Sequence, residues 1–274
     1  MTSVAPARPH AAWAEAGPLR AFVRDTLAIA ATELHKLSRD PTEIVTRAVQ
    51  PALWLVVFGG VFSRLRAIPT GNLDYLAFMA PGVLAQSVLF ISIFFGIAVI
   101  WERDLGIIHK LLVSPAPRGA LVVGKAVSAG LRGLAQGVIV YVLALVLGVR
   151  LQFGVVPLVV VALLVLLSSA LFATFSLSVA CLVKTRERFM GIGQLLTMPL
   201  FFASNAIYPL SVMPPWLRVV ARVNPLTYVV DGLRGAMVQG GHSVLGLGPD
   251  LAFEAVAFLA LTALAARLYP GLVR

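Results

Sequence analysis

Continuous apolar runs longer than about 18 residues recur along this chain, and they constrain its fold more than any other feature. A run of that length crosses a bilayer as a helix, because every backbone polar group must be bonded within the segment. Only 12% of the 274 residues are charged, which is about half the share of a soluble domain. The sequence therefore predicts an all-α membrane protein. Six spans are expected, at residues 44–62, 75–101, 121–147, 155–183, 190–208 and 251–268.

The basic residues predict how these spans are oriented. Lys and Arg are concentrated before the first span, between the second and third, and between the fourth and fifth. Short loops rich in Lys and Arg stay in the cytoplasm, so both termini are expected on the cytoplasmic side. These loops account for the formal charge of +10, and no basic stripe interleaved with aromatic residues indicates nucleic-acid binding.

Two segments precede the first span. Residues 1–17 are rich in proline and lack the apolar core of a cleavable signal, so they are predicted to form a mobile tail. Residues 18–40 have apolar side chains at three- and four-residue spacing opposite Arg20, Arg24 and Lys36, which predicts an amphipathic helix on the membrane surface. A soluble amphipathic helix is the alternative, although the chain offers it no soluble core. Residues 41–274 form the predicted six-span domain.

The loop at residues 101–120 is the best-specified segment. Residues 103–113 can form a short helix with Leu105, Ile108, Leu111 and Leu112 on one face, and the Ser-Pro-Ala-Pro sequence after it ends the helix. A charged, partly apolar helix on the cytoplasmic side is suited to docking a soluble partner. An ordinary cytoplasmic loop fits the same residues equally well.

The end of this loop resembles a nucleotide-binding phosphate loop, because Gly119 to Lys125 reads G-x-x-x-x-G-K. Residue 126 is Ala, however, where a hydroxyl would bind magnesium. No strand is expected before Gly119, and a membrane span follows Lys125. The chain itself is therefore not expected to bind ATP, and Lys125 is interpreted as a cytoplasmic anchor of the third span.

Residues 205–250 combine five prolines with two short apolar stretches, neither long enough to span. In the first stretch Trp216, Leu217, Val220 and Val223 share a face opposite Arg218 and Arg222. We expect two short helices dipping into the outer surface of the membrane, since irregular backbone at that depth must be covered by protein or water. A plain exposed loop is the alternative.

Polar residues inside the spans suggest either helix packing or a substrate pathway. Ser128, Arg132 and Gln136 recur at four-residue spacing, and an arginine in hydrocarbon must face protein or a water-filled path. Packing within the bundle or across a dimer is the favoured interpretation, with a substrate pathway as the alternative. Glu254 is either a proton site or a residue facing the membrane interface, and the second is favoured.

Enzyme chemistry has little support. The four histidines are scattered without a paired metal ligand, and no nucleophile and base recur at a recognisable spacing. Cys181 is the single cysteine, so an intrachain disulfide is excluded. No catalytic, cofactor-binding or metal-binding residue is expected on this chain.

Two separated motifs resemble the ABC-2 type exporter permeases, in the branch that exports daunorubicin and nodulation factors. The first is E-R-x-x-G-x-x-x-K-L-L-V-S-P-x-x-R-x-x-x-x-x-G-K, from Glu102 to Lys125. The second joins Y-P-L-S-x-M-P-P-W-L, from Tyr208, to N-P-L-T-Y-x-V-D-x-L-R, which ends at Arg234. With six spans and the amphipathic lead-in, the resemblance covers nearly the whole chain.

The resemblance implies roles for the first two of the following three groups of residues. The ATPase-coupling group is Glu102, Arg103, Gly106, Ile108, His109, Lys110, Leu111, Leu112, Ser114, Pro115 and Arg118. The outer re-entrant group is Tyr208, Pro209, Pro214, Pro215, Trp216, Asn224, Pro225, Asp231 and Arg234. The dimer interface or pathway is assigned to Ser128, Arg132, Gln136, Phe201, Phe202 and Asn205. Ile108 and His109 depart from the family, whose members often have an acidic residue near the loop helix.

The implied partners are two ABC-type ATPase subunits, which carry the ATP and Mg, a second permease copy or a homologous permease, and membrane lipids. The expected function is export of a hydrophobic or amphiphilic substrate, such as a drug, lipid, glycolipid or polysaccharide, across the cytoplasmic membrane of a prokaryote. The alternative is an ion-gradient-driven transporter or channel, which predicts functional carboxylates within the spans and internal repeats. Of these features only Glu254 was found.

Overall fold

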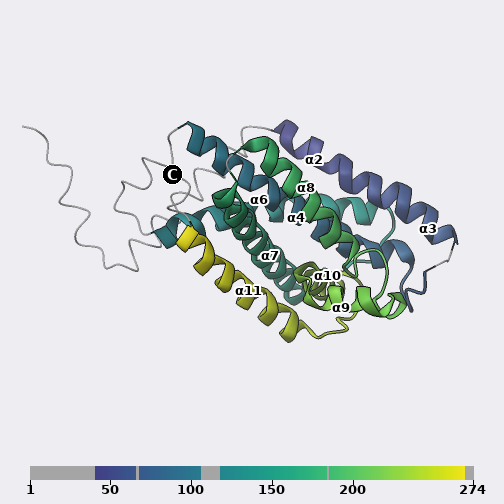
Figure 1. Ribbon diagram of the computed structural model, residues 1–274. Helices are drawn as coiled ribbons and strands as arrows, with labels where there is room; N and C mark the ends of the chain where they lie inside the picture. Colours follow the sequence, from purple (N-terminus) through teal and green to yellow (C-terminus); the bar gives the residue numbers. More distant parts are fainter. Residues whose placement is uncertain (1–40, 66–67, 106–117, 184, 269–274) are drawn as a thin grey trace, which may run out of the picture.

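The computed structural model describes residues 41–65, 68–105, 118–183 and 185–268, which form a bundle of helices (Figure 1). In chain order these are α2 (Pro41–Leu53), the π-helix η2 (Trp54–Gly59), α3 (Gly60–Leu65), α4 (Tyr75–Asp104), α6 (Arg118–Val146), α7 (Val155–Leu182), α8 (Arg186–Phe202), the 3-10 helix η3 (Leu210–Val212), α9 (Pro215–Val223), α10 (Pro225–Met237) and α11 (Leu247–Leu268). Within these ranges the one β-type pairing is an isolated bridge between Leu151 and Val238. The predicted all-α membrane fold is confirmed. The tail at 1–17 and the amphipathic helix at 18–40 lie outside the described residues.

Four of the described helices are long and apolar enough to cross a membrane: Tyr75–Asp104, Ala126–Val146, Val155–Leu182 and Leu247–Leu268. They correspond to the second, third, fourth and sixth predicted spans. The first predicted span corresponds to α2, η2 and α3, of which Ala48–Arg64 is a shorter apolar helix. The fifth corresponds to α8, which has 17 residues. The count of six therefore remains a prediction.

The ends of α8 differ from the predicted range of 190–208, and local side chains explain both. At the start, the Thr185 hydroxyl accepts from the Arg188 N–H at 3.4 Å, so the helix begins at Arg186. At the other end, the Ser204 hydroxyl donates to the Phe201 carbonyl at 2.7 Å and accepts from the Ala206 N–H at 3.3 Å. These bonds compete with the helical ladder, so the chain turns after Phe202.

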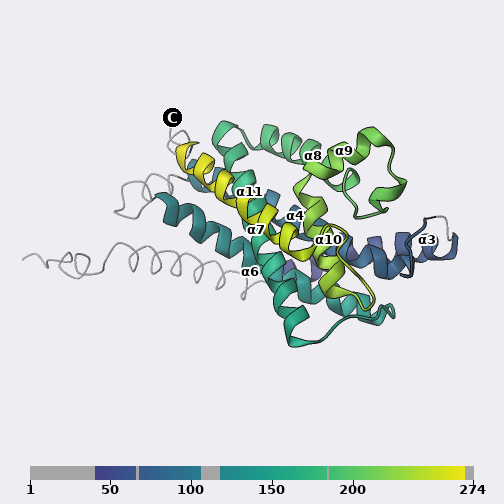
Figure 2. The ribbon, with the colours of Figure 1, turned by 90° about the horizontal axis from the view of Figure 1, so that it is seen from below.

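The long helices run side by side, and α9 and α10 gather at one end of the bundle (Figures 1 and 2). We call this the short-helix end and the opposite one, where α4 finishes and α8 begins, the loop end. Helix α4 passes through the middle, with 71% of its most apolar window buried, whereas the corresponding figure for α11 is 11%. The exposed sides of α11 are therefore the ones suited to contact lipid.

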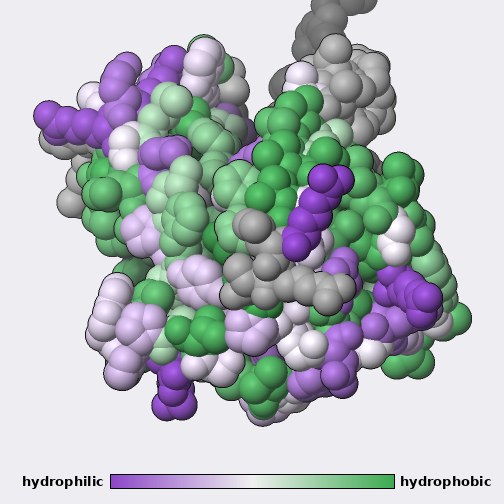
Figure 3. Space-filling view, turned by 90° about the vertical axis from the view of Figure 1, so that its right-hand side faces the viewer, coloured by the Kyte–Doolittle hydropathy of each residue, from purple (hydrophilic) through white to green (hydrophobic). Residues whose placement is uncertain are grey.

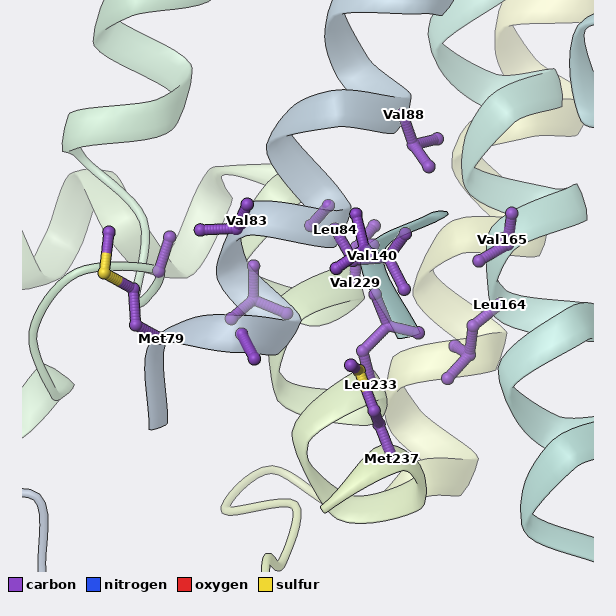
Figure 4. Close-up of a cluster of buried hydrophobic side chains, with 14 of the residues drawn as sticks. Met79, Val83, Leu84, Val88, Val140, Leu164, Val165, Val229, Leu233 and Met237 are labelled. Atoms are coloured by element: carbon purple, nitrogen blue, oxygen red, sulfur yellow. The ribbon is translucent and has the colours of Figure 1, made fainter. Parts of the chain in front are cut away.

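The core lies where α10 returns into the bundle (Figure 4). Side chains from four helices meet there: Met79, Val83, Leu84 and Val88 from α4, Val140 from α6, Leu164 and Val165 from α7, and Val229, Leu233 and Met237 from α10. All are at most 1% exposed. Although α10 is too short to span, its apolar side chains fix the surrounding long helices.

Small residues allow the helices to approach closely. A Cβ atom added at Gly133 of α6 would collide with the Ser169 side chain of α7, and one added at Gly82 of α4 would collide with the backbone of Ala206. Such contacts let backbones pack where lipid offers no hydrophobic gain for helix association.

A side chain of α7 bonds to the backbone of α4 within this continuous helix. The Ser176 hydroxyl donates to the Ile93 carbonyl at 2.6 Å and accepts from the Gly96 N–H at 3.1 Å. A side chain inserted into the backbone ladder is a recognised cause of helix bending. The insertion joins α4 and α7 at the level of Gly96, which has no side chain to prevent it.

Candidate functional site

At the loop end, polar side chains attach the end of α4 to the start of α8. Asp104 Oδ2 accepts from Arg186 Nη2 at 2.8 Å and Nε at 3.1 Å, and Asp104 Oδ1 accepts from Arg103 Nη2 at 3.1 Å. The Arg186 guanidinium also lies 3.9 Å above the centre of the Trp101 ring. Arg103 reaches the Val183 carbonyl between α7 and α8 at 3.3 Å. We call Trp101, Arg103, Asp104 and Arg186 the clamp.

The clamp revises the predicted start of the coupling loop. Glu102 and Arg103 belong to α4, which continues to Asp104 rather than ending at Trp101. Arg118 is the first residue of α6. The remaining predicted coupling residues lie outside the described residues: Gly106, Ile108, His109, Lys110, Leu111, Leu112, Ser114 and Pro115. Sequence reasoning did not select Asp104 or Arg186, which are 82 positions apart.

Helices α2, α4 and α6 line an open cavity of about 370 Å³. Its lining comprises Thr46, Gln50, Ser87, Phe90, Ile91, Phe94, Ala98, Arg132 and Gln136. We call this space the central cavity. The structure thus brings Arg132 and Gln136 to an open space, as a pathway would require, together with Gln50 and Ser87, which the spacing pattern did not indicate.

The other residues assigned to the interface or pathway do not line the central cavity. Ser128 is buried on α6. Phe201 is buried edge-on against Trp54, with 5.3 Å between the ring centres, whereas Phe202 is 45% exposed. Asn205 lies at the short-helix end. The group predicted as one site therefore divides between two places.

At the short-helix end the Arg234 side chain is buried in a cage of backbone and aromatic groups. Its Nη2 donates to the Asn205 carbonyl at 2.7 Å and to the Phe78 carbonyl at 3.3 Å, and its guanidinium lies 3.8 Å from the centre of the Phe78 ring. Asn224 caps α10 by accepting from the Leu226 N–H at 3.0 Å, and it donates to the Leu200 carbonyl at 2.7 Å. These contacts hold α10 in the bundle.

The remaining residues of the predicted outer group shape the entry to α9 and α10. Pro215 and Pro225 occupy the first turns of α9 and α10, where a missing N–H costs nothing, and Pro214 is the N-cap of α9. The Tyr208 hydroxyl donates to the Phe202 carbonyl, and Pro209 precedes η3. The two predicted short helices are thus present, and the alternative of a plain loop is wrong.

A second cavity, of about 540 Å³, opens at this end. Asn205, Pro209, Phe78 and Arg234 contribute to its lining, along with the loop at 69–73 and His242. The side of the molecule where α3 and α9 lie carries both hydrophilic and hydrophobic surface (Figure 3). On α9, Trp216 is 68% and Val223 is 70% exposed, which is suited to the predicted contact with a membrane surface.

The favoured interpretation of Glu254 is wrong. Glu254 is 0% exposed, so it faces the protein interior rather than the membrane interface. Asp250, one turn earlier on α11, is also 0% exposed, and so is Asp231 on α10. Sequence reasoning missed Asp250 because an acidic residue in the first turn of a helix is normally exposed and stabilises the helix dipole.

Comparison with known proteins decides the family. A family profile described as ABC-2 type transporter matches residues 24–238. The chain belongs to the ABC-2 type transporter family. It is 28% identical over 216 residues to the transport permease ycf38 of Cyanophora paradoxa, covering 78% of this chain and 74% of that one. It is 27% identical over 211 residues to the inner membrane transport permease YadH of Escherichia coli K12, covering 74% and 79%.

A third relative of this ABC-2 chain is the daunorubicin resistance ABC transporter permease protein DrrB1 of Streptomyces coeruleorubidus. The two are 25% identical over 230 residues, which is 84% of this chain and 80% of the relative. The chain is thus the membrane subunit of an ABC transporter, and the resemblance seen in its two motifs is confirmed.

Proposed function

We propose that this permease exports a hydrophobic or amphiphilic substrate from the cytoplasm or the inner leaflet. The observation that carries the proposal is the lining of the central cavity. Gln50, Ser87, Arg132 and Gln136 offer polar groups, while Phe90, Ile91 and Phe94 offer apolar surface beside them. A drug, a lipid or a glycolipid has both kinds of surface, and sites for such molecules are mainly apolar with a few placed polar groups. The resistance named for the relative DrrB1 supports the outward direction.

In this proposal two ABC-type ATPase subunits dock on the cytoplasmic side and bind the ATP and Mg. A second copy of the permease, or a homologous one, completes the membrane part, with both termini in the cytoplasm of a prokaryotic cell. The clamp lies at the loop end, next to the segment that resembles the coupling helix. ATPase closure would press on that segment, and α4 and α8 would move together because Asp104 and Arg186 join them.

The same helix links this movement to the substrate. Helix α4 carries Trp101, Arg103 and Asp104 at its end and Ser87, Phe90 and Phe94 along the cavity. A displacement of its loop end therefore reaches the cavity lining at Ala98, which lies on the part of α4 after Gly96. This geometry supports a population shift between a cavity open to the inside and one open to the outside.

The proposal is tested by reconstituting the permease with its ATPase in vesicles and measuring ATP-driven substrate movement. Arg132→Gln is expected to reduce transport while the ATPase remains bound, because the cavity loses a positive charge. Arg150→Gln, which changes an exposed arginine outside the cavity, is the matched control. Equal transport by both variants would contradict the cavity assignment. ATP hydrolysis by the purified permease alone would contradict the separate ATPase.

The ion-driven alternative has one observation in its favour, the burial of Asp231, Asp250 and Glu254. Glu254→Gln distinguishes the two functions. The ATP-driven exporter retains transport with this variant, whereas loss of transport with intact coupling to the ATPase would favour the ion-driven alternative.

A further inference from the structure

Three carboxyl groups lie together where α10 meets α11, away from both the clamp and the central cavity. Asp231 comes from α10, Asp250 and Glu254 come from α11, and Ser243 lies in the loop between the helices. The Ser243 hydroxyl oxygen is 2.8 Å from Asp231 Oδ2 and 2.9 Å from Asp250 Oδ2. All three carboxyl side chains are 0% exposed, whereas Ser243 is partly exposed.

The glycines of α10 make this arrangement possible. A Cβ atom at Gly232 would lie 3.4 Å from Asp250 Oδ2, and one at Gly235 would lie 2.9 Å from the Ser243 backbone nitrogen. The loop and the first turn of α11 thus pack directly on the α10 backbone. The packing of α11 on α10 therefore places the three carboxyl groups close together.

The hydrogen bonds of Ser243 determine where a proton must be. A hydroxyl donates one hydrogen bond and accepts up to two. Its oxygen already accepts from the Gly246 N–H at 2.6 Å, and its single proton can be given to only one of the two aspartates. The other aspartate lies at 2.8 to 2.9 Å and must donate instead, because an ionised carboxylate has nothing to donate.

The surroundings of the two aspartates identify the one that carries the proton. Asp231 Oδ2 also accepts from the Leu245 N–H at 2.8 Å, and Asp231 Oδ1 lies 3.4 Å from the Asn205 amide. Arg234, one turn along α10, adds a favourable positive charge. Asp250 Oδ1, by contrast, is buried without a hydrogen-bond partner in the described part of the chain. Asp231 is therefore the ionised member.

Glu254 is placed one turn deeper, next to Asp250. Both of its carboxyl oxygens are buried and lack a hydrogen-bond partner among the described residues. A charge in such a place would be very costly, and a carboxyl group then remains neutral by holding a proton.

Among their described side chains, the helices packed most closely on α11 supply no cation to Glu254 that would change this conclusion. Helix α7 contains no Asp, Glu, Lys, Arg or His, and its one ionisable side chain is Cys181. Helix α10 contributes Asp231, Tyr228 and Arg234, and the Arg234 guanidinium is bonded to the Phe78 and Asn205 carbonyls. The ionisable side chains described on α6 are Arg132, at the central cavity, and Tyr141. His242, in the loop, is exposed.

We propose that Asp250 and Glu254 form a proton-binding site within the sixth predicted span, reached from the short-helix end through Ser243. The Asp250 proton lies on Oδ2 and points to the Ser243 oxygen, while the Ser243 proton points to Asp231 Oδ2. When Asp250 has released its proton, the Ser243 hydroxyl rotates toward Asp250 Oδ2 and transfers its proton to it, while a proton on Asp231 Oδ2 forms the new O–H bond of Ser243, so that Asp231 ends ionised and Asp250 protonated. The site binds protons whatever substrate the permease moves.

Infrared spectroscopy of the full-length permease in lipid vesicles tests the proposal, because a protonated carboxyl has its own C=O absorption. At neutral pH, Asp250→Asn and Glu254→Gln are each expected to remove a separate part of the intensity of this C=O band. The double variant is expected to remove both parts. Asp231→Asn and Glu187→Gln, the latter changing an exposed carboxylate of α8, are expected to leave the band intact. A band unchanged in the double variant, or lost with Asp231→Asn alone, would overturn the assignment.

Two further measurements keep the test decisive if a variant does not fold. Dicyclohexylcarbodiimide, which modifies protonated carboxyls in apolar surroundings, is expected to label Glu254 or Asp250 of the wild-type chain and not Asp231, as read by peptide mass. Absence of label from both α11 residues would contradict the site. Ser243→Ala is expected to slow the deuterium shift of the Asp250 band in heavy water, and an unchanged exchange rate would contradict the route.

Discussion

Asp104 at the end of α4 and Arg186 at the start of α8 form a two-pronged ion pair, with Nη2–Oδ2 at 2.8 Å and Nε–Oδ2 at 3.1 Å. The pair joins the end of α4 directly to the start of α8. Because both side chains are about one third exposed, the pair is suited to transmitting a displacement more than to stabilising the fold.

The first prediction concerns this pair. Asp104→Asn is expected to weaken the response of the ATPase to substrate while leaving the melting temperature nearly unchanged, because an exposed pair contributes little stability. Substrate-stimulated ATP hydrolysis by the assembled transporter measures the effect. Exchanging the charges, with Asp104→Arg and Arg186→Asp together, is expected to restore part of the response. Arg188→Gln, which changes an exposed arginine two residues further along α8, is the control, and an equal loss with it would contradict the role of the clamp.

The second prediction concerns the buried arginine of α10. Arg234→Met is expected to destabilise the permease by about 3 kcal/mol, because it leaves buried carbonyls unpaired and Asp231 without its neighbouring charge. Arg234→Lys is expected to recover little, since an ammonium cannot reproduce the fork of a guanidinium. Thermal unfolding followed by size-exclusion chromatography provides the measurement. Arg222→Met, on the exposed side of α9, should remain within experimental error of the wild type.

The third prediction concerns the close contact between α6 and α7. Gly133→Ala is expected to cost about 1 to 3 kcal/mol, because its Cβ atom would collide with Ser169. The matched variant Gly191→Ala places its Cβ atom in open space on α8 and is expected to stabilise by up to about 1 kcal/mol, through better helix propensity. Denaturation in detergent compares the two. Similar values for both glycines would show that this contact does not limit packing.

The fourth prediction concerns water in the central cavity. In a Cys181→Ala background, Ser87→Cys is expected to react with a small hydrophilic thiol reagent, because Ser87 lines the cavity. Leu164→Cys, in the core and 0% exposed, is expected to stay unmodified. Mass spectrometry after timed labelling reads the result. Modification at equal rates would mean that the reagent enters by unfolding and not through the cavity.

The fifth prediction concerns orientation. Trp216→Cys, in the same cysteine-free background, is expected to be labelled by an impermeant reagent added outside intact cells, and Glu187→Cys only after the cells are opened. Trp216 is exposed on α9 and Glu187 is exposed at the loop end, so both are accessible once the reagent reaches their side. The reverse pattern would invert the predicted topology.

Length and apolarity were sufficient to predict four of the helices, because a helix that must satisfy its backbone in lipid needs about 20 apolar residues. The end of α8 was not predictable in the same way. It depends on Ser204, whose hydroxyl takes over bonds of the helical ladder only once the turn has formed.

For the sites too, spacing within one helix was predictable from the sequence, whereas contacts between helices were not. The common face of Arg132 and Gln136 follows from four-residue spacing, but Gln50 and Ser87 come from other helices and join them only through packing. The burial of Asp250 and Glu254 depends on the return of α10 into the bundle, which no pattern within α11 reveals. Sequence periodicity therefore indicated which side chains share a face, and tertiary contacts determined what that face meets.

The insertion of Ser176 into the ladder of α4 has a consequence for how this helix can vary between relatives. Residues before Ile93 are held by the core, whereas residues after Gly96 lead to the clamp, and the borrowed hydrogen bonds lie between the two parts. A substitution in the second part can tilt that segment without disturbing the first. Within one continuous helix, the residues that pack in the core can thus stay constant while the residues near the clamp change to fit a different ATPase subunit.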